Sequence, residues 1–192
     1  MRLILATRNA HKVRELEPLL APHELTLLPE EVELPPETGD TFTENALIKA
    51  RAAHQATGRP AVADDSGIAA RALGGRPGVR SARYAGEDAT DEENLAKLLR
   101  EVAPDGDTHV AYECVLAYVD DDGELTAHGS CEGELTHDAR GDGGFGYDPA
   151  FVPADRDDGR TMAELSPDEK DAISHRGRAA RALAERLSEE RP

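Results

Sequence analysis

The octapeptide Pro60-Ala61-Val62-Ala63-Asp64-Asp65-Ser66-Gly67 lies at the centre of the predicted fold. Its three small or β-branched apolar residues predict a short buried strand, which we expect to end at the two carboxylates. Open α/β sheets bind ligands beyond the carboxyl ends of their strands. Adjacent carboxylates repel each other, so they would accept a Mg²⁺ ion, and one aspartate would remain to deprotonate a water. A plain Asx-turn at the strand end is the alternative interpretation.

The chain begins with a second strand, followed by a polar turn and a helix. Arg2–Ala6 is apolar, and apolar residues recur at helical spacing over Val13–Leu20. Unpaired amides at such a helix start suit an anion, and Lys12 adds a full positive charge. The turn is therefore a candidate phosphate cradle, although it lacks the glycines of a P-loop and an ordinary helix start remains open. Its residues are Thr7, Arg8, Asn9, Ala10, His11 and Lys12.

Further helices and strands are indicated by caps and apolar patterns. Three Ser/Thr-x-x-Glu capping boxes predict helix starts at Thr41, Thr90 and Ser166. Additional strands are predicted at Leu25–Leu28, in a hairpin of His109–Val119 with Glu124–His128, and at Cys131–Leu135.

Two glycine-rich segments and an acidic loop are candidate ligand-contacting regions. Gly67–Gly86 reads as an irregular, locally basic loop, and in Gly141–Pro149 either Phe145 or Tyr147 offers a stacking face. Glu37 and Glu44 flank a predicted helix start, so either could turn toward the aspartates as a metal ligand, or remain a solvated charge.

Composition narrows the class of protein. The net charge of −17 disfavours binding of long nucleic acid, since phosphate neutralisation needs clustered Lys and Arg. The sequence holds no apolar run long enough to span a membrane. Two cysteines, Cys114 and Cys131, indicate no disulfide framework, so a soluble cytoplasmic protein is expected.

Six blocks in order resemble the inosine/xanthosine triphosphate pyrophosphatases, which remove noncanonical purine nucleotides. The resemblance runs nearly end to end, and six ordered blocks are far more specific than any one. They are Ala6-Thr7-x-Asn9-x-x-Lys12, Glu37-Thr38-Gly39-x-Thr41-Phe42, Ala63-Asp64-Asp65-Ser66-Gly67, Ser81-Ala82-Arg83-Tyr84, Gly143-Gly144-Phe145-Gly146-Tyr147-Asp148-Pro149 and Lys170-x-Ala172-x-Ser174-His175-Arg176.

The resemblance implies a fold and an activity. The fold would be a single α/β domain over residues 1–192, with a long mixed sheet flanked by helices and two lobes around a central cleft. The activity would be Mg²⁺-dependent hydrolysis of ITP, dITP and XTP between the α- and β-phosphates, releasing a nucleoside monophosphate and pyrophosphate. A homodimer is also implied.

The resemblance further implies roles for individual residues. Asp65 would be the proton acceptor and a metal ligand, with Glu37 as its metal-side partner. Arg8 stands where relatives often have glycine, so an extra contact or a tighter turn is expected there. The remaining residues would bind substrate: Thr7, Arg8, Asn9, Ala10, His11 and Lys12 the triphosphate, Ser66 the substrate, Phe145, Gly146, Tyr147 and Asp148 the base and sugar, and Lys170, His175 and Arg176 again the substrate.

Two rival functions remain open at this point. A nucleotide-binding regulator without hydrolysis would keep the cradle, but it would be preferred only if Lys12 or Asp65 were absent, and both are present. An aspartyl-phosphate phosphatase would need its second aspartate two residues after the nucleophile, whereas Asp64 and Asp65 are adjacent.

Overall fold

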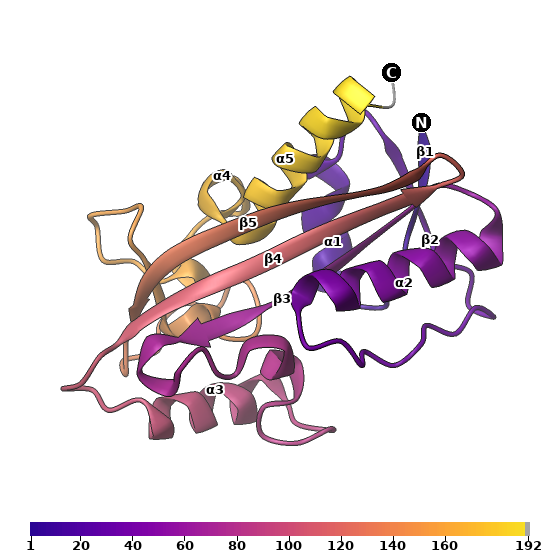
Figure 1. The fold of residues 1–192 in the computed structure, drawn as a ribbon. Coiled ribbons are helices and arrows are strands. Elements are labelled where there is room, and N and C mark those ends of the chain that lie inside the picture. The colour runs from indigo at the N-terminus through magenta and orange to yellow at the C-terminus, as the bar shows by residue number, and fades with distance from the viewer. Residues whose placement is uncertain (191–192) are drawn as a thin grey trace. The chain divides into compact units, whose positions relative to one another are not determined.

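The computed structural model describes residues 1–190, and within them the chain forms a six-stranded mixed sheet. The strand order is β2-β1-β3-β4-β5-β6. Strand β1 pairs in parallel with β2 and β3, whereas β5 pairs antiparallel with β6. The predicted mixed α/β fold is confirmed (Figure 1). The strands are β1 Arg2–Leu5, β2 Glu24–Leu27, β3 Ala61–Ala70, β4 His109–Asp120, β5 Gly123–Leu135 and β6 Phe151–Pro153.

Helices flank the sheet and begin where the caps predict. The boxes Thr41/Glu44, Thr90/Glu93 and Ser166/Glu169 all form in both directions, and Gly58 ends its helix at φ 62°. The helices are α1 Ala10–Leu19, α2 Phe42–Thr57, α3 Asp91–Glu101, α4 Pro167–Ile173 and α5 His175–Glu190, with 3₁₀ turns η1 Arg71–Leu73, η2 Gly78–Arg83, η3 Asp148–Ala150 and η4 Met162–Glu164.

The chain divides into two compact units. The first unit holds residues 1–65, 114–129 and, in the described part, 176–190, whereas the second holds 66–113 and 130–175. Strands β3, β4 and β5 each contribute residues to both units. That the whole chain is one domain with a central cleft stays a prediction.

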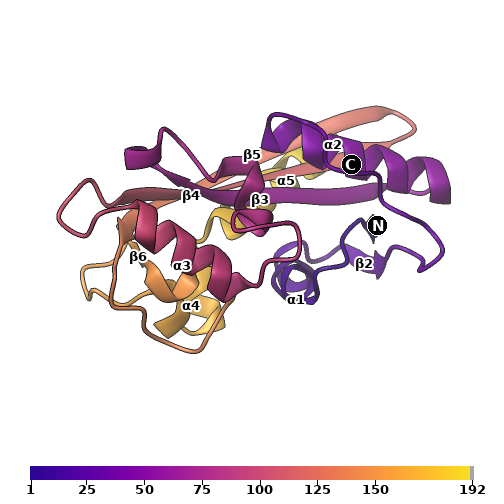
Figure 2. The same cartoon turned by 90° about the horizontal axis from the view of Figure 1, so that it is seen from below.

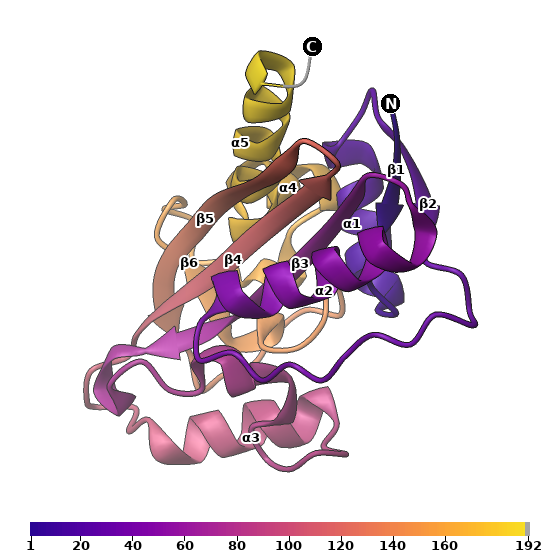
Figure 3. The same ribbon diagram turned by 45° about the vertical axis from the view of Figure 1, so that its right-hand side comes forward.

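The sheet of the first unit is covered on both faces. Leu3, Leu5 and Val62 pack with leucines of α1 and α5, whereas Ala61 and Ala63 pack with the alanine stripe of α2. Since side chains alternate along a strand, successive residues of β3 face opposite layers. Figure 3 shows α2 in front of the strands, and Figure 1 shows α5 on their other side.

The second unit has an aromatic core. Tyr112 on β4 lies 4.5 Å, centroid to centroid, from Phe151 on β6. Tyr147 is also buried, and its hydroxyl donates a 2.7 Å hydrogen bond to the carbonyl of Ser81. These contacts fix the glycine-rich segment 141–149 against η2.

Two sequence predictions about strand ends were wrong. Strand β3 does not stop at Asp64 but continues to Ala70, so the aspartates and the first residues of the expected loop Gly67–Gly86 lie inside it. Strand β5 likewise runs unbroken to Leu135, because its buried positions continue to alternate through Gly129 and Cys131. Small residues at inward positions hid this period from the sequence pattern.

Within residues 1–190, no helix is long and apolar enough to cross a membrane. Cys114 and Cys131 are both buried. Burial raises the pKa of the Cys114 thiol to about 12, so that thiol stays protonated.

Candidate active site

The polar turn after β1 forms the start of α1. Asn9 caps this helix, and its side-chain oxygen accepts from the amides of His11 at 2.9 Å and Lys12 at 3.3 Å. Thr7 is buried and accepts from the Asn9 amide at 3.2 Å, whereas Ala10 and His11 are exposed. With no acidic residue in its first turn, this helix end keeps its positive character.

Asp64 is buried between two cations on the α1/α5 face. Its carboxylate lies 2.8 Å from Lys12 Nζ and 3.5 Å from Arg176 Nε. Arg176 also forms an ion pair with Glu15 on α1. Burial alone would raise the pKa of Asp64, but Lys12, Arg176 and Lys49 hold it well below the usual value. Asp64 is therefore ionised at neutral pH.

Asp65, the next residue, faces α2. Its carboxylate accepts from Asn45 Nδ2 at 3.2 Å and from Lys49 Nζ at 3.4 Å. Burial raises the pKa of Asp65, the Glu37 carboxylate raises it further, and Lys49 and Lys12 offset only part of the increase. A raised pKa makes this carboxylate a better proton acceptor than an ordinary aspartate. The charge of Lys12 thus acts on Asp65 as well as on Asp64.

Glu37 and Asp65 fit a divalent cation. Both carboxylates contact the single ammonium of Lys49, Glu37 at 2.5 Å and Asp65 at 3.4 Å. Mg²⁺ typically takes one or two protein carboxylates together with substrate phosphates and water. In the described part of the chain no group of three His, Cys, Asp or Glu residues is arranged to hold a metal.

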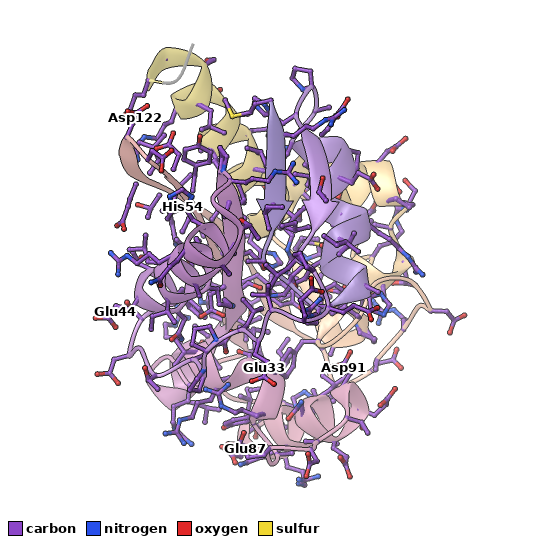
Figure 4. All side chains as sticks on the ribbon, turned by 90° about the vertical axis from the view of Figure 1, so that its right-hand side faces the viewer. Glu33, Glu44, His54, Glu87, Asp91 and Asp122 are labelled. Carbon is purple, nitrogen blue, oxygen red and sulfur yellow. The ribbon has the colours of Figure 1, made fainter. Side chains whose placement is uncertain are left out.

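Glu44, the other metal-ligand candidate, has a different role. Its carboxylate accepts from the amides of Asp40 at 2.8 Å and Thr41 at 3.0 Å, which closes the capping box of α2. The side chain is exposed and lies at the rim of the molecule in Figure 4. Of the two glutamates, only Glu37 shares a cation with Asp65.

Asn45 and Lys49 belong to this site, and the sequence analysis missed them. Both are buried polar residues on α2, one turn apart, beside the apolar stripe of Ala46 and Ala50. Polar residues at positions i and i+4 within a buried face are a detectable signal, because a buried lysine needs an anion to pair with. The partners only become evident when β3 is placed against α2.

In the second unit, Asp148 organises the predicted base-contacting residues. It is buried and accepts from Lys170 Nζ at 2.8 Å, Tyr112 hydroxyl at 3.0 Å and the Phe145 amide at 2.9 Å. Lys170 Nζ also lies 5.1 Å from the centroid of the Phe145 ring. The half-buried Phe145 is thus oriented by a neutralised ion pair.

Tyr112 links Asp148 to His175. The Tyr112 and His175 rings stack with centroids 4.5 Å apart and planes inclined by 10°. Tyr147 is buried in the core, so of the two predicted aromatics only Phe145 stays partly exposed. The Gly146 amide donates to Asp91 at 2.8 Å, and Ser66 is partly exposed on β3.

Two predicted substrate-contacting arginines have protein partners here. Arg176 is 1% exposed and pairs with Asp64 and Glu15, as described above. Burial would lower the pKa of Arg176, but these anions raise it, so the charge is permanent. The Arg8 guanidinium donates to backbone carbonyls of residues 28–32.

A lysine in the first turn of α1 and a buried lysine within α2, beside a carboxylate of raised pKa on a sheet strand, are typical of an α/β enzyme that acts on phosphorylated small molecules. The chain belongs to the Ham1 family, since the sequence model of that family matches residues 3–186.

Named relatives cover nearly the whole chain. The dITP/XTP pyrophosphatase of Shigella flexneri is 50% identical over 195 residues, covering 97% of this chain and 98% of that protein. The dITP/XTP pyrophosphatase of Escherichia coli K12 is 48% identical, with the same coverage.

Solved structures of relatives share the fold. A HAM1 protein from Coxiella burnetii superposes with a TM-score of 0.87 at 45% identity, covering 98% of this chain and 99% of that one. A nucleoside-triphosphatase described as a dITP/XTP pyrophosphatase, from Mycobacterium abscessus, gives 0.75 at 46% identity, covering 95% and 98%.

Proposed function

We propose that this protein hydrolyses noncanonical purine nucleoside triphosphates (ITP, dITP and XTP) to the monophosphate and pyrophosphate. The observation that carries the proposal is the Asp65 carboxylate, whose pKa is raised while Lys49 and Lys12 hold positive charge beside it. The names of the close relatives support the same activity.

The first unit supplies charge for the triphosphate. Lys12, Lys49 and the start of α1 are cationic or electropositive groups beside Asp64 and Asp65 of β3. Such groups stabilise the charge that develops on phosphate oxygens during phosphoanhydride cleavage. Thr7, Asn9, Ala10 and His11 lie on the same turn and are assigned to triphosphate binding with Lys12.

Asp65 is assigned as the general base. It would take the proton from the attacking water, and Asn45 and Lys49 hold its carboxylate in place. Mg²⁺, held by Glu37 and Asp65, would neutralise phosphate charge when bound. Lys49 keeps the two carboxylates close together, which is the role that the ion pairs support directly.

The second unit is assigned to the base and sugar. Phe145 offers a partly exposed ring, and Asp148 fixes its backbone, while Gly146, Tyr147 and Lys170 shape the same segment. Inosine and xanthosine present an O6 acceptor, whereas adenine presents an amino donor. A donor facing that amino group would stay unsatisfied, which costs about 1–3 kcal/mol, or about one to two powers of ten per contact.

Ser66, His175 and Arg176 complete the assigned substrate contacts. His175 is held by stacking on Tyr112, whereas Arg176 is buried against Asp64 and Glu15 and keeps its charge there. We also assign a cytoplasmic homodimer. A sequence with two cysteines and no disulfide framework is typical of a reducing compartment, and sedimentation would test the dimer.

The test is a comparison of kcat/KM for pyrophosphate release from ITP, XTP, GTP and ATP in Mg²⁺. The proposal expects ITP and XTP to exceed ATP by at least about tenfold, following the cost of one unsatisfied donor. GTP shares the O6 acceptor, so slower turnover of GTP would rest on exclusion of its 2-amino group. Equal turnover of ITP and GTP, or turnover of neither, would contradict the substrate assignment.

A further inference from the structure

Arg8 makes an unusual set of contacts for an exposed side chain. Its guanidinium donates to the carbonyls of Leu28, Pro29 and Val32 at 2.8 Å each, and to that of Glu30 at 3.4 Å. A planar guanidinium with several fixed N–H donors suits such a convergent set of acceptors. Four backbone carbonyls are thereby gathered on one cation.

These carbonyls belong to the segment 28–41, which we call the Glu37 loop. It connects β2 to α2 and contains little regular structure. Figures 1 and 3 show it as an extended trace between these two elements, and Figure 2 shows both of its ends from below. Pro29, Pro35 and Pro36 have no backbone N–H, which limits the number of hydrogen bonds that can form within the loop.

The two ends of the loop are anchored differently. The end near α2 is held by helix residues, since the Gly39 amide donates to Asn45 Oδ1 at 2.8 Å and the Asp40 amide to Glu44 at 2.8 Å. At the end near β2, Leu28 is buried and its amide donates to Leu5. The carbonyls that follow are held by Arg8.

Arg8 therefore joins two parts of the candidate site. It lies between Thr7 and the helix cap Asn9, in the turn that also carries Lys12. Its guanidinium binds the loop that carries Glu37, whose carboxylate reaches the Lys49 ammonium shared with Asp65. These hydrogen bonds therefore connect residues 7–12, which we call the phosphate turn, to the loop that carries Glu37.

We propose that Arg8 is a positioning residue that straps the Glu37 loop to the phosphate turn, so that Glu37 is presented beside Asp65 for a divalent cation. This inference rests on the proposed function insofar as Glu37 is a metal ligand. It replaces the expected substrate contact of Arg8, because the donors of its guanidinium are directed to backbone carbonyls.

The test uses full-length Arg8→Ala and Arg8→Lys, with Arg2→Ala as the matched control. Arg2 is also an exposed arginine close to β1, but it pairs with Glu24 and does not contact the loop. Binding of Mn²⁺ alone is followed by electron paramagnetic resonance without nucleotide. Amide hydrogen exchange of residues 28–37 and thermal unfolding are measured on the same samples.

For Arg8→Ala we expect Mn²⁺ to bind about tenfold more weakly, the typical effect of losing a group that orients a metal ligand. Exchange of the loop amides should accelerate by about tenfold or more while the midpoint of thermal unfolding stays close to that of Arg2→Ala. In turnover of ITP, the half-saturating Mg²⁺ concentration should rise, and kcat should recover at high Mg²⁺. Arg8→Lys should be intermediate, because an ammonium cannot span four carbonyls.

Unchanged Mn²⁺ affinity and unchanged loop exchange in Arg8→Ala would overturn the proposal. Weaker binding of pyrophosphate with unchanged Mn²⁺ affinity would make Arg8 a phosphate ligand instead, which also overturns it. If the wild type does not hydrolyse ITP but Arg8→Ala still binds Mn²⁺ more weakly and exchanges its loop amides faster, the positioning role of Arg8 is supported and the proposed function is contradicted.

Discussion

Asp64 and Asp65 are neighbours in the chain, yet the two faces of β3 give them opposite properties. On the α1/α5 face, Asp64 is enclosed by Lys12 and Arg176, and its pKa falls well below the usual range. On the α2 face, Asp65 meets Lys49 and Asn45 but also the Glu37 carboxylate, and its pKa rises. Alternation along the strand places the two side chains in different layers.

This difference in pKa suits the two carboxylates to different roles, Asp64 to an ion pair and Asp65 to proton transfer. Two carboxylates whose surroundings drive their pKa values apart are a recurrent arrangement in enzymes that need distinct roles from one residue type. Asp64 stays ionised at neutral pH and holds Lys12, the proposed phosphate ligand. Asp65 has the higher proton affinity and is the group that would accept a proton from water.

The largest expected effect is on turnover by Asp65→Asn. The amide keeps the shape of the side chain and its contact with Asn45 but cannot take a proton, so kcat should fall by about 10²–10⁴ while the KM for ITP changes little. Steady-state pyrophosphate release measures this. Asp122→Asn, at an exposed turn far from these contacts in sequence, is the control. Near-wild-type kcat in Asp65→Asn would move the base elsewhere.

Asp64→Asn should act mainly on stability. Removing this anion leaves Lys12 and the fully buried Arg176 without their shared carboxylate, although Arg176 keeps Glu15. Breaking a buried pair from one side costs about 3–5 kcal/mol of unfolding free energy. Urea unfolding of this variant beside Asp65→Asn checks the comparison. A variant that loses turnover with unchanged stability would assign Asp64 to the chemistry instead.

A smaller effect concerns the pH dependence of stability, measured in EDTA. The lowered pKa of Asp64 stabilises the fold above the unfolded pKa of about 3.9, and this contribution is lost as the pH falls below that value. The raised pKa of Asp65 has the opposite sign, because ionising it as the pH rises above about 3.9 costs stability.

Asp65→Asn should consequently gain stability relative to the wild type as the pH rises from about 4 to 7. Asp64→Asn should instead lose stability relative to the wild type as the pH rises through the acid range up to about 4, so its deficit is smallest at the lowest pH. Urea unfolding of the three proteins at a series of pH values makes the comparison. The same sign for both variants would contradict the assignment of the two faces.

Much of the fold was predictable because local signals agreed with it. The capping boxes at Thr41, Thr90 and Ser166 each begin a helix, and the short strand at Arg2–Leu5 forms as the apolar run indicates. The end of β3 was not predictable from its pattern. Paired carboxylates usually leave a sheet, and here cations from α1, α2 and α5 allow them to stay in it.

Candidate site residues were predictable where short sequence motifs mark them and not where only packing brings them together. Lys12, Glu37 and Asp65 were identified from motifs, but Lys49 and Asn45 reach Asp65 across 16 and 20 residues. The contacts of Arg8 could not be foreseen, since its acceptors are backbone carbonyls, which any sequence supplies.

In the proposed reaction, water cleaves the bond between the α- and β-phosphates of a 6-oxopurine triphosphate. Rapid-quench analysis of one turnover of ITP in Mg²⁺ identifies the bond that breaks. Inosine monophosphate and pyrophosphate should appear together in equal amounts. Inosine diphosphate with orthophosphate would contradict it.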